Sequence, residues 1–248
     1  TLPEYNDTAP SGVVTIFRPG SLQYDPNVHF DRGTFGTTQL KPISSWNFDL
    51  TGEYYTRSGG SLIVSLFYKD ISDLIFNTLT TGVTVPGQTL PFRIQGPRNL
   101  GKATVKGFEL GVNQPFKFLP SPLDGFGLQA NYTFVDSNID ADIPEAQFGL
   151  PGSSRHNANV VLYYEKYGAG IRLGYTYRTQ YLLGLTESYP NIQEPITNLD
   201  LNVSYAITKN IEITGSIINI TAANRREFAL NPLALSNFYN RPRFYTFG

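Results

Sequence analysis

The 248-residue chain contains no cysteine and no methionine, and it has only two histidines and one tryptophan. Without cysteine, a disulfide framework and a thiolate metal site are both excluded. The 19 Lys and Arg residues nearly balance the 20 Asp and Glu residues, which leaves a formal net charge of −1. Nucleic-acid binding requires a basic stripe that can neutralise phosphates. We therefore expect no nucleic-acid partner.

Long apolar runs are also missing, since no stretch approaches the roughly 18 residues that a membrane helix requires. The N-terminal TLPEYNDTAP has neither a basic start nor the apolar segment of a signal peptide, and position 1 is not methionine. We expect the chain to be processed or to be part of a longer polypeptide. What is abundant is 16 Tyr, 17 Phe, 23 Gly and 17 Pro, a composition that suits strands and turns.

The stretch AGIRLGYTYRTQYL, residues 169–182, alternates between two kinds of side chain. Ile171, Leu173 and Tyr175 occupy one parity, whereas Arg172 and Thr176 occupy the other. Successive side chains of a strand point to opposite faces, so this pattern predicts a strand with one apolar and one polar face. Two structures produce it: the antiparallel sheet of a soluble protein, or a transmembrane barrel with its apolar face in lipid.

Eight further segments show the same alternation, so the chain contains nine predicted strands: residues 48–55, 61–69, 105–113, 128–135, 157–164, 169–178, 198–205, 211–217 and 243–247. Their connections alternate strictly, with short ones after the odd-numbered segments and long ones after the even-numbered segments. Membrane barrels sort their connections in this way, with short turns on the periplasmic side and long loops outside. Tyrosines gather near the strand ends, as in an interfacial girdle. The sequence therefore predicts an all-β fold, an antiparallel transmembrane β-barrel.

Several strings, in order and spacing, resemble the C-terminal part of the barrel of TonB-dependent outer-membrane receptors: LKPISSWNFDLTGEYY (40–55), SLIVSLFYKDISDLI (61–75), LGKATVKGFELG (100–111), LDGFGLQANYTFVDS (123–137), LPGSSRHNANVVLYYEK (150–166) and LDLNVSYAITKNIEITGSIINIT (199–221). The branch that they resemble is a proteobacterial one often associated with oligosaccharide uptake. The resemblance implies a 22-stranded barrel in the outer membrane of a Gram-negative bacterium, filled by a plug domain and driven by the TonB energy complex.

Nine strands are an odd number, whereas single-chain bacterial barrels have even numbers. An open sheet in lipid would leave unpaired backbone groups at several kcal/mol each. We therefore expect the remaining strands and the plug to come from the same longer polypeptide. Residues 1–45 are predicted to be mostly an extracellular loop, with 13–17 a strand fragment or a loop hairpin, and residues 46–248 to hold the barrel strands.

Ligand contacts are expected at the outer strand ends and loops, where aromatic faces and planar donors occur together. The substrate-binding candidates are Trp46, Arg178, Tyr181, Tyr189, Arg225, Arg226, Phe238 and Tyr239. Charged residues on the polar parity are expected to face the lumen or the plug: Asp49, Glu53, Glu109, Arg172, Asp200 and Glu212. Sugars and iron chelates could both use such residues, so the ligand stays open.

Other chemistries find little support. Residues 136–142, DSNIDAD, begin like a calcium loop, but Ala141 stands where glycine is expected and Gln147 where glutamate is expected. A solvated acidic loop is the favoured interpretation, and we predict no metal and no cofactor. His29 and His156 have no catalytic partner motif, so we predict that the protein is not an enzyme.

The leading hypothesis is energy-coupled transport of a scarce nutrient, an oligosaccharide or an iron chelate, with outer-membrane lipid and a small ligand as partners. One alternative is a passive porin or structural barrel, which would lack a plug. Another is a secreted, soluble β-sandwich that acts on polysaccharide.

Overall fold

The computed structural model describes residues 5–8, 11–17, 31–84, 92–99, 101–141, 147–186, 189–229 and 232–248. Its strands form three sheets of nine, five and four strands. None of these residues belongs to a helix that is long and apolar enough to span a membrane.

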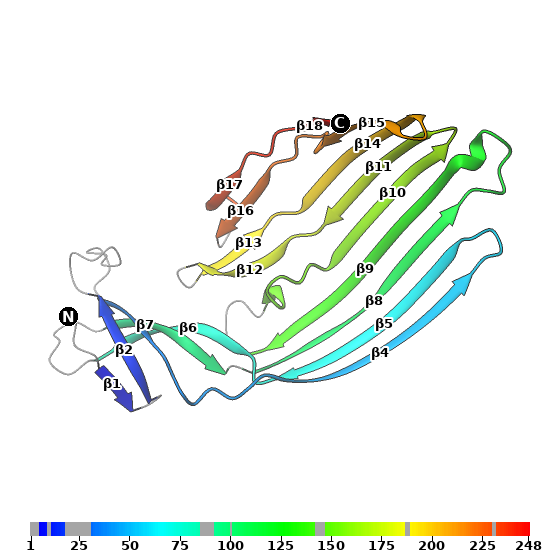
Figure 1. Cartoon of the computed structure of the whole chain (residues 1–248). Coiled ribbons are helices and arrows are strands. Elements are labelled where there is room, and N and C mark those ends of the chain that lie inside the picture. The colour runs from blue at the N-terminus through cyan, green and yellow to red at the C-terminus, as the bar shows by residue number, and fades with distance from the viewer. Residues whose placement is uncertain are drawn as a thin grey trace. The chain divides into compact units, whose positions relative to one another are not determined.

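The nine-stranded sheet contains all nine predicted strands, which confirms the all-β prediction. Its neighbours follow the order of the chain from one edge to the other, as Figure 1 shows. The pairs from β9 to β18 are antiparallel. The strands are β4 (Ser44–Tyr55), β5 (Ser61–Ser72), β8 (Lys102–Pro115), β9 (Phe126–Asp140), β10 (His156–Lys166), β11 (Ala169–Arg178), β14 (Ile196–Thr208), β15 (Ile211–Ile218) and β18 (Phe244–Phe247).

One face of this sheet carries continuous apolar rows. A single row in register joins Leu128, Leu162, Leu173, Leu201 and Ile217 across five neighbouring strands. Leu162 and Leu173 remain 43% and 38% exposed. A second sheet packed on this face would bury these side chains, so the exposure contradicts the β-sandwich alternative. The lipid-facing row predicted for β11 matches this geometry.

The opposite face is polar. Its register places Asn131 beside Asn159, Asn159 beside Thr176, and Thr176 beside Asn198. Because side chains alternate along each strand, this polar row necessarily lies behind the apolar one. The two faces therefore have the unlike chemistry of a barrel wall.

Short turns join the strands at one end of the sheet. One of two turns of only two residues is Tyr167–Gly168 between β10 and β11, where φ is 55° and 78°. Positive φ at both central residues is the type I′ geometry that matches the twist of paired strands. The Tyr167 hydroxyl shares a hydrogen bond of 2.7 Å with Ser121 Oγ in the neighbouring turn. This bond, together with the adjacent Lys166 ammonium, lowers the pKa of Tyr167.

Two of the long connections are ordered as hairpins that the sequence did not reveal. One contains β12 (Tyr181–Thr186) and β13 (Tyr189–Gln193), and the other contains β16 (Arg225–Ala229) and β17 (Leu235–Tyr239). β13 pairs with β16, so the two connections form one four-stranded sheet. Leu182, Ile192 and Phe228 form its buried apolar cluster, against which Phe148 packs.

A separate compact unit contains the five-stranded sheet. Its strands are β1 (Tyr5–Thr8), β2 (Ser11–Phe17), β3 (Asp31–Phe35), β6 (Ile75–Val83) and β7 (Phe92–Asn99). The predicted strand at 13–17 lies in β2, which pairs with β1 as a hairpin. β3 and β7 pair in parallel. Asn99 connects two segments of this unit, because its Nδ2 donates to the carbonyl oxygens of Lys41 (2.9 Å) and Asp73 (2.7 Å).

Candidate ligand site at the long-loop end

A cavity of about 400 Å³ lies at the long-loop end, lined by residues of β9, β10, β12 and β13 and by the segments 147–155 and 179–180. Its volume falls within the roughly 300–1,000 Å³ typical of small-molecule sites. Segment 147–153 borders it and is held on both sides: Leu150 N donates to Ser137 Oγ (3.2 Å), and Gly152 N donates to the Leu182 carbonyl (2.7 Å). Polar and aromatic lining residues include Asp136, Gln147, Arg155, His156, Gln180 and Tyr181.

Arg178 lies beside this cavity at the end of β11. Its Cζ is 3.8 Å from the ring centroid of Tyr181, a cation–π contact. Its Nε donates to Ser154 Oγ at 2.5 Å, and its Nη2 donates to the carbonyl of Gly152. Both acceptors are neutral, and in the described part of the chain no carboxylate forms an ion pair with Arg178. Its positive charge is therefore available to an anion.

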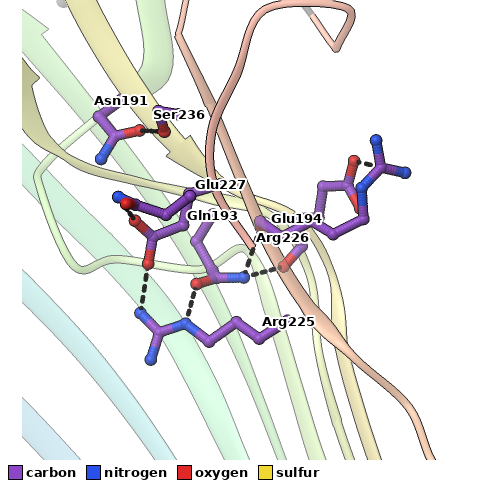
Figure 2. Close-up of polar contacts among 8 residues, drawn as sticks. Asn191, Gln193, Glu194, Arg225, Arg226, Glu227 and Ser236 are labelled. Carbon is purple, nitrogen blue, oxygen red and sulfur yellow. Dashed lines mark hydrogen bonds and ion pairs between the residues drawn. The ribbon is translucent and has the colours of Figure 1, made fainter. Parts of the chain in front are cut away.

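Arg225 has the opposite environment. Its Nε donates to Gln193 Oε1 and its Nη2 donates to Glu227 Oε1 at 3.0 Å, as Figure 2 shows. Glu227 is 4% exposed, and its other oxygen accepts from Asn237 Nδ2 at 2.8 Å. Arg225 Cζ also lies 5.3 Å from the Tyr239 ring centroid. Because Glu227 compensates its charge, Arg225 stabilises the four-stranded sheet of β12, β13, β16 and β17, called the loop sheet below, rather than offering a free cation.

Gln193 is the centre of this network. It is fully buried at 0% exposure, and its Nε2 donates to the carbonyl oxygens of Arg226 (3.0 Å) and Glu194 (3.2 Å). Arg226 Nη1 lies 3.5 Å from Glu194 Oε1, so this guanidinium is also compensated. Every polar atom of the Gln193 side chain is thus engaged. A satisfied buried network of this kind rigidifies the structure that contains it.

The remaining ligand candidates are scattered. Phe238 and Tyr239 lie on β17 and are 53% and 47% exposed. Trp46 is 76% exposed on β4, an edge strand of the nine-stranded sheet. Tyr189 begins β13, but its side chain lies outside the described residues. The structure therefore brings Arg178 to Tyr181 and Arg225 to Tyr239, and it does not group Trp46 with either pair.

The predicted lumen residues occupy the polar parity of their strands, and half of them have polar partners on the same sheet. Arg172 pairs with Glu165, and Glu53 accepts a hydrogen bond from the Tyr55 hydroxyl. Asp200 accepts from Asn198 Nδ2 at 2.6 Å and from Asn219 N at 2.7 Å. Asp49, Glu109 and Glu212 lie on β4, β8 and β15. Contact of any of these residues with a plug stays a prediction.

Sequence reasoning missed the buried polar residues Gln193, Glu227 and Asn219. Asn219 is 2% exposed and has φ of 57° at the start of a long connection. Its Oδ1 accepts from Ala223 N at 3.0 Å, and its Nδ2 donates to the Arg241 carbonyl at 2.7 Å. Asparagine tolerates this left-handed backbone and closes local turns. That tendency is the only feature of the sequence that could have indicated a structural role for Asn219.

Residues 136–140 are extended in the structure, which does not favour the calcium-loop alternative, and residues 142–146 of that segment lie outside the described residues. Residues 136–140 belong to β9, whereas the first residues of a calcium loop turn around the ion. Asp136 instead contacts Lys106 Nζ (3.7 Å) and Arg155 Nη2 (4.0 Å). Among the described residues, no group of three His, Asp or Glu side chains is arranged to hold a metal. His156 Nδ1 hydrogen-bonds the Tyr132 hydroxyl at 2.7 Å, and His29 lies outside the described residues.

A family model described as TonB dependent receptor-like, beta-barrel matches residues 3–220. No curated protein sequence matches the chain. Among solved structures, one similar protein is a mutant ferric enterobactin receptor of Pseudomonas aeruginosa in complex with enterobactin. It is 18% identical and has a TM-score of 0.63. The match covers 95% of this chain and 37% of the receptor. The siderophore receptor PirA of Acinetobacter baumannii is 14% identical with a TM-score of 0.60, over 94% of this chain and 37% of its own.

The ferric yersiniabactin receptor FyuA of Yersinia pestis is 21% identical with a TM-score of 0.54, over 74% of this chain and 26% of its own. At these identities the likeness concerns the fold. The chain spans about a third of the length of the structures that it matches. The predicted receptor fold is confirmed, whereas the oligosaccharide-uptake branch stays a prediction.

Proposed function

Because this chain belongs to the TonB-dependent receptor-like β-barrel family, we propose that it forms the C-terminal barrel portion of an energy-coupled receptor for a scarce nutrient. The protein is located in the outer membrane of a Gram-negative bacterium. The observation that carries the proposal is the exposed apolar row from Leu128 to Ile217, backed by a polar face. Acyl chains can cover such a row without burying any polar side chain.

The rest of the receptor follows from the family and from backbone hydrogen bonding. β4 and β18 are the free edges of the sheet, and unpaired backbone groups in hydrocarbon cost several kcal/mol each. We propose that further strands of the same longer polypeptide close the barrel, with a plug inside it and the TonB energy complex as partner. In this arrangement residues 46–248 cross the membrane with short periplasmic turns, and residues 1–45 are extracellular.

The ligand class follows from charge. Arg178 offers a guanidinium with neutral partners, beside the aromatic ring of Tyr181 and a cavity of about 400 Å³. An uncompensated cation at a partly dry site favours an anion over a neutral sugar. The structures named above are a ferric yersiniabactin uptake receptor, a ferric enterobactin receptor and a siderophore receptor. We infer that an anionic iron chelate, rather than an oligosaccharide, is the ligand.

The test uses the full-length receptor, purified in detergent. Titration with ferric catecholate and ferric carboxylate chelates, and separately with neutral oligosaccharides, compares the two ligand classes. Binding of a chelate that weakens at least tenfold in Arg178→Gln is the expected result. Binding of a neutral oligosaccharide that is indifferent to this substitution would overturn the chelate assignment.

The transport step is tested in cells. Uptake of the bound ligand should stop when a protonophore collapses the proton-motive force, since the family couples transport to the inner membrane. Uptake that continues unchanged would instead support the passive porin, whose flux follows the gradient alone.

A further inference from the structure

At the long-loop end, the apolar face finishes in a group of aromatic rings. The ring centroids of Phe108 and Phe134 are 5.6 Å apart, and those of Phe134 and His156 are 5.4 Å apart. The ring centroid of Tyr132 is 5.9 Å from that of Phe108 and 6.1 Å from that of His156, so the four rings form one group. Such rings mark the depth at which hydrocarbon gives way to headgroups.

The opposite boundary of this face lies at Phe126, whose ring meets that of Tyr164 at 4.8 Å. From Phe126 to Phe134 the outward positions of β9 are Phe126, Leu128, Ala130, Tyr132 and Phe134. This length matches the roughly 9–11 residues of a tilted membrane crossing. The next outward residue after Phe134 is Asp136, which therefore lies at the headgroup level of the outer leaflet.

Two cations lie at this level on the outward side. Lys106 shares the outward parity of Phe108 on β8, and the Arg155 Cζ lies 5.5 Å from the Phe134 ring centroid. Both contact Asp136, but loosely, at 3.7 Å and 4.0 Å. Their side chains are 64% and 65% exposed. Exposed pairs with this geometry contribute little, so the cations remain available to a stronger anion.

We propose that Lys106 and Arg155 bind the phosphate of a phosphorylated lipid headgroup in the outer leaflet, with its acyl chains lying along Phe134, Ala130 and Leu128. Three observations fit one amphiphile: two exposed cations against one carboxylate, an aromatic rim directly beneath them, and an apolar row below the rim. Arg155 also lines the cavity beside Arg178, so the lipid site neighbours the proposed ligand site, but it uses neither Arg178 nor Tyr181; it rests on the outer-membrane location.

The experiment measures lipid binding by the full-length receptor. The receptor is reconstituted in vesicles of phosphatidylcholine alone or mixed with lipid A, and retained lipid A is counted by native mass spectrometry after extraction in mild detergent. The double substitution Lys106→Gln with Arg155→Gln is expected to lower lipid A affinity by about 30-fold, since a cation at a membrane surface contributes roughly 1 kcal/mol. The matched control, Lys209→Gln, neutralises an exposed lysine in a short turn and is expected to leave binding unchanged.

Asp136→Asn should have the opposite effect. It removes the carboxylate that competes for Lys106 and Arg155, so lipid A affinity should rise. Each variant is checked for the heat-dependent gel shift of a folded barrel. Equal lipid A retention in the double variant and in the wild type would overturn the proposal. So would displacement of lipid A by millimolar inorganic phosphate alone, which would identify a site for the free anion rather than for a lipid.

Discussion

The guanidinium carbon of Arg178 lies 3.8 Å from the ring centroid of Tyr181, while Ser154 and Gly152 accept its hydrogen bonds. Ser154 is itself buried at 2% exposure. The guanidinium is thus held in place before any ligand arrives. A preorganised donor loses less conformational entropy on binding than a free one, which makes Arg178 the most informative residue of the candidate site.

Arg178→Lys keeps the charge but loses the stacked plane and the fork of donors. We expect ligand affinity to fall about tenfold, measured by intrinsic fluorescence titration of the full-length receptor. Arg226→Lys is the matched control, because Glu194 already compensates that guanidinium. Equal losses in both variants would show that Arg178 has no special role.

Leu173→Arg places a charge in the middle of the apolar row on β11. A cation at that depth on a lipid face destabilises a barrel by about 2–4 kcal/mol. Thr176→Arg lies on the polar face of the same strand, beside Asn159 and Asn198, and should be tolerated. The midpoint of urea unfolding in lipid vesicles measures both, and the reverse order of stability would contradict the assignment of the faces.

Gly107→Ala tests the close approach of β8 and β9. A Cβ at this position would overlap the carbonyl oxygen of Phe134 and come within 2.6 Å of the Phe67 ring. We expect a loss of about 1–3 kcal/mol in unfolding free energy, as for other overpacked sites. Gly111→Ala, in the same strand, would meet only Ile63 Cβ at 3.6 Å and should cost far less. The temperature of the gel-mobility shift distinguishes them.

Glu227→Ala removes the compensating charge of Arg225 and leaves Gln193 beside an unpaired cation. Glu227 is buried but the Arg225 side chain is 36% exposed, so we expect a loss below the roughly 3–5 kcal/mol of a fully buried pair, with local loosening between the two loop hairpins. Trypsin should then cleave at Arg225 or Arg226 in outer-membrane vesicles much faster than in wild type. Leu233→Ala alters a residue that is 96% exposed in the same connection and should leave the digestion rate unchanged.

The nine barrel strands could be predicted because each one carries its own evidence. Alternation in β11 or β9 follows from a local rule, since a strand between lipid and water must sort its side chains. The face that each side chain occupies could be predicted as well, because a slip by one residue would turn a row such as Leu162–Leu173 toward the polar face.

The loop sheet could not be predicted in this way. β13 is short and contains Pro190, and its stability comes from pairing with β16, a segment distant in the sequence. The burial of Gln193 and Glu227 depends on that pairing, so no local pattern identifies them. The candidate list named Arg225 and Tyr239 for ligand contact, whereas the structure shows that Arg225 is already satisfied by neighbours within the loops.

Chain length between partners sets the order in which the strands can find each other. Two residues separate β10 from β11 (Tyr167 and Gly168) and β14 from β15 (Lys209 and Asn210), whereas residues 179–195 separate β11 from β14. Closing a longer loop costs more chain entropy, and early native contacts are mostly local. We expect the β10–β11 and β14–β15 hairpins to acquire protected amides before the β11–β14 pair in pulse-labelled refolding, so that they serve as templates on which neighbouring strands assemble.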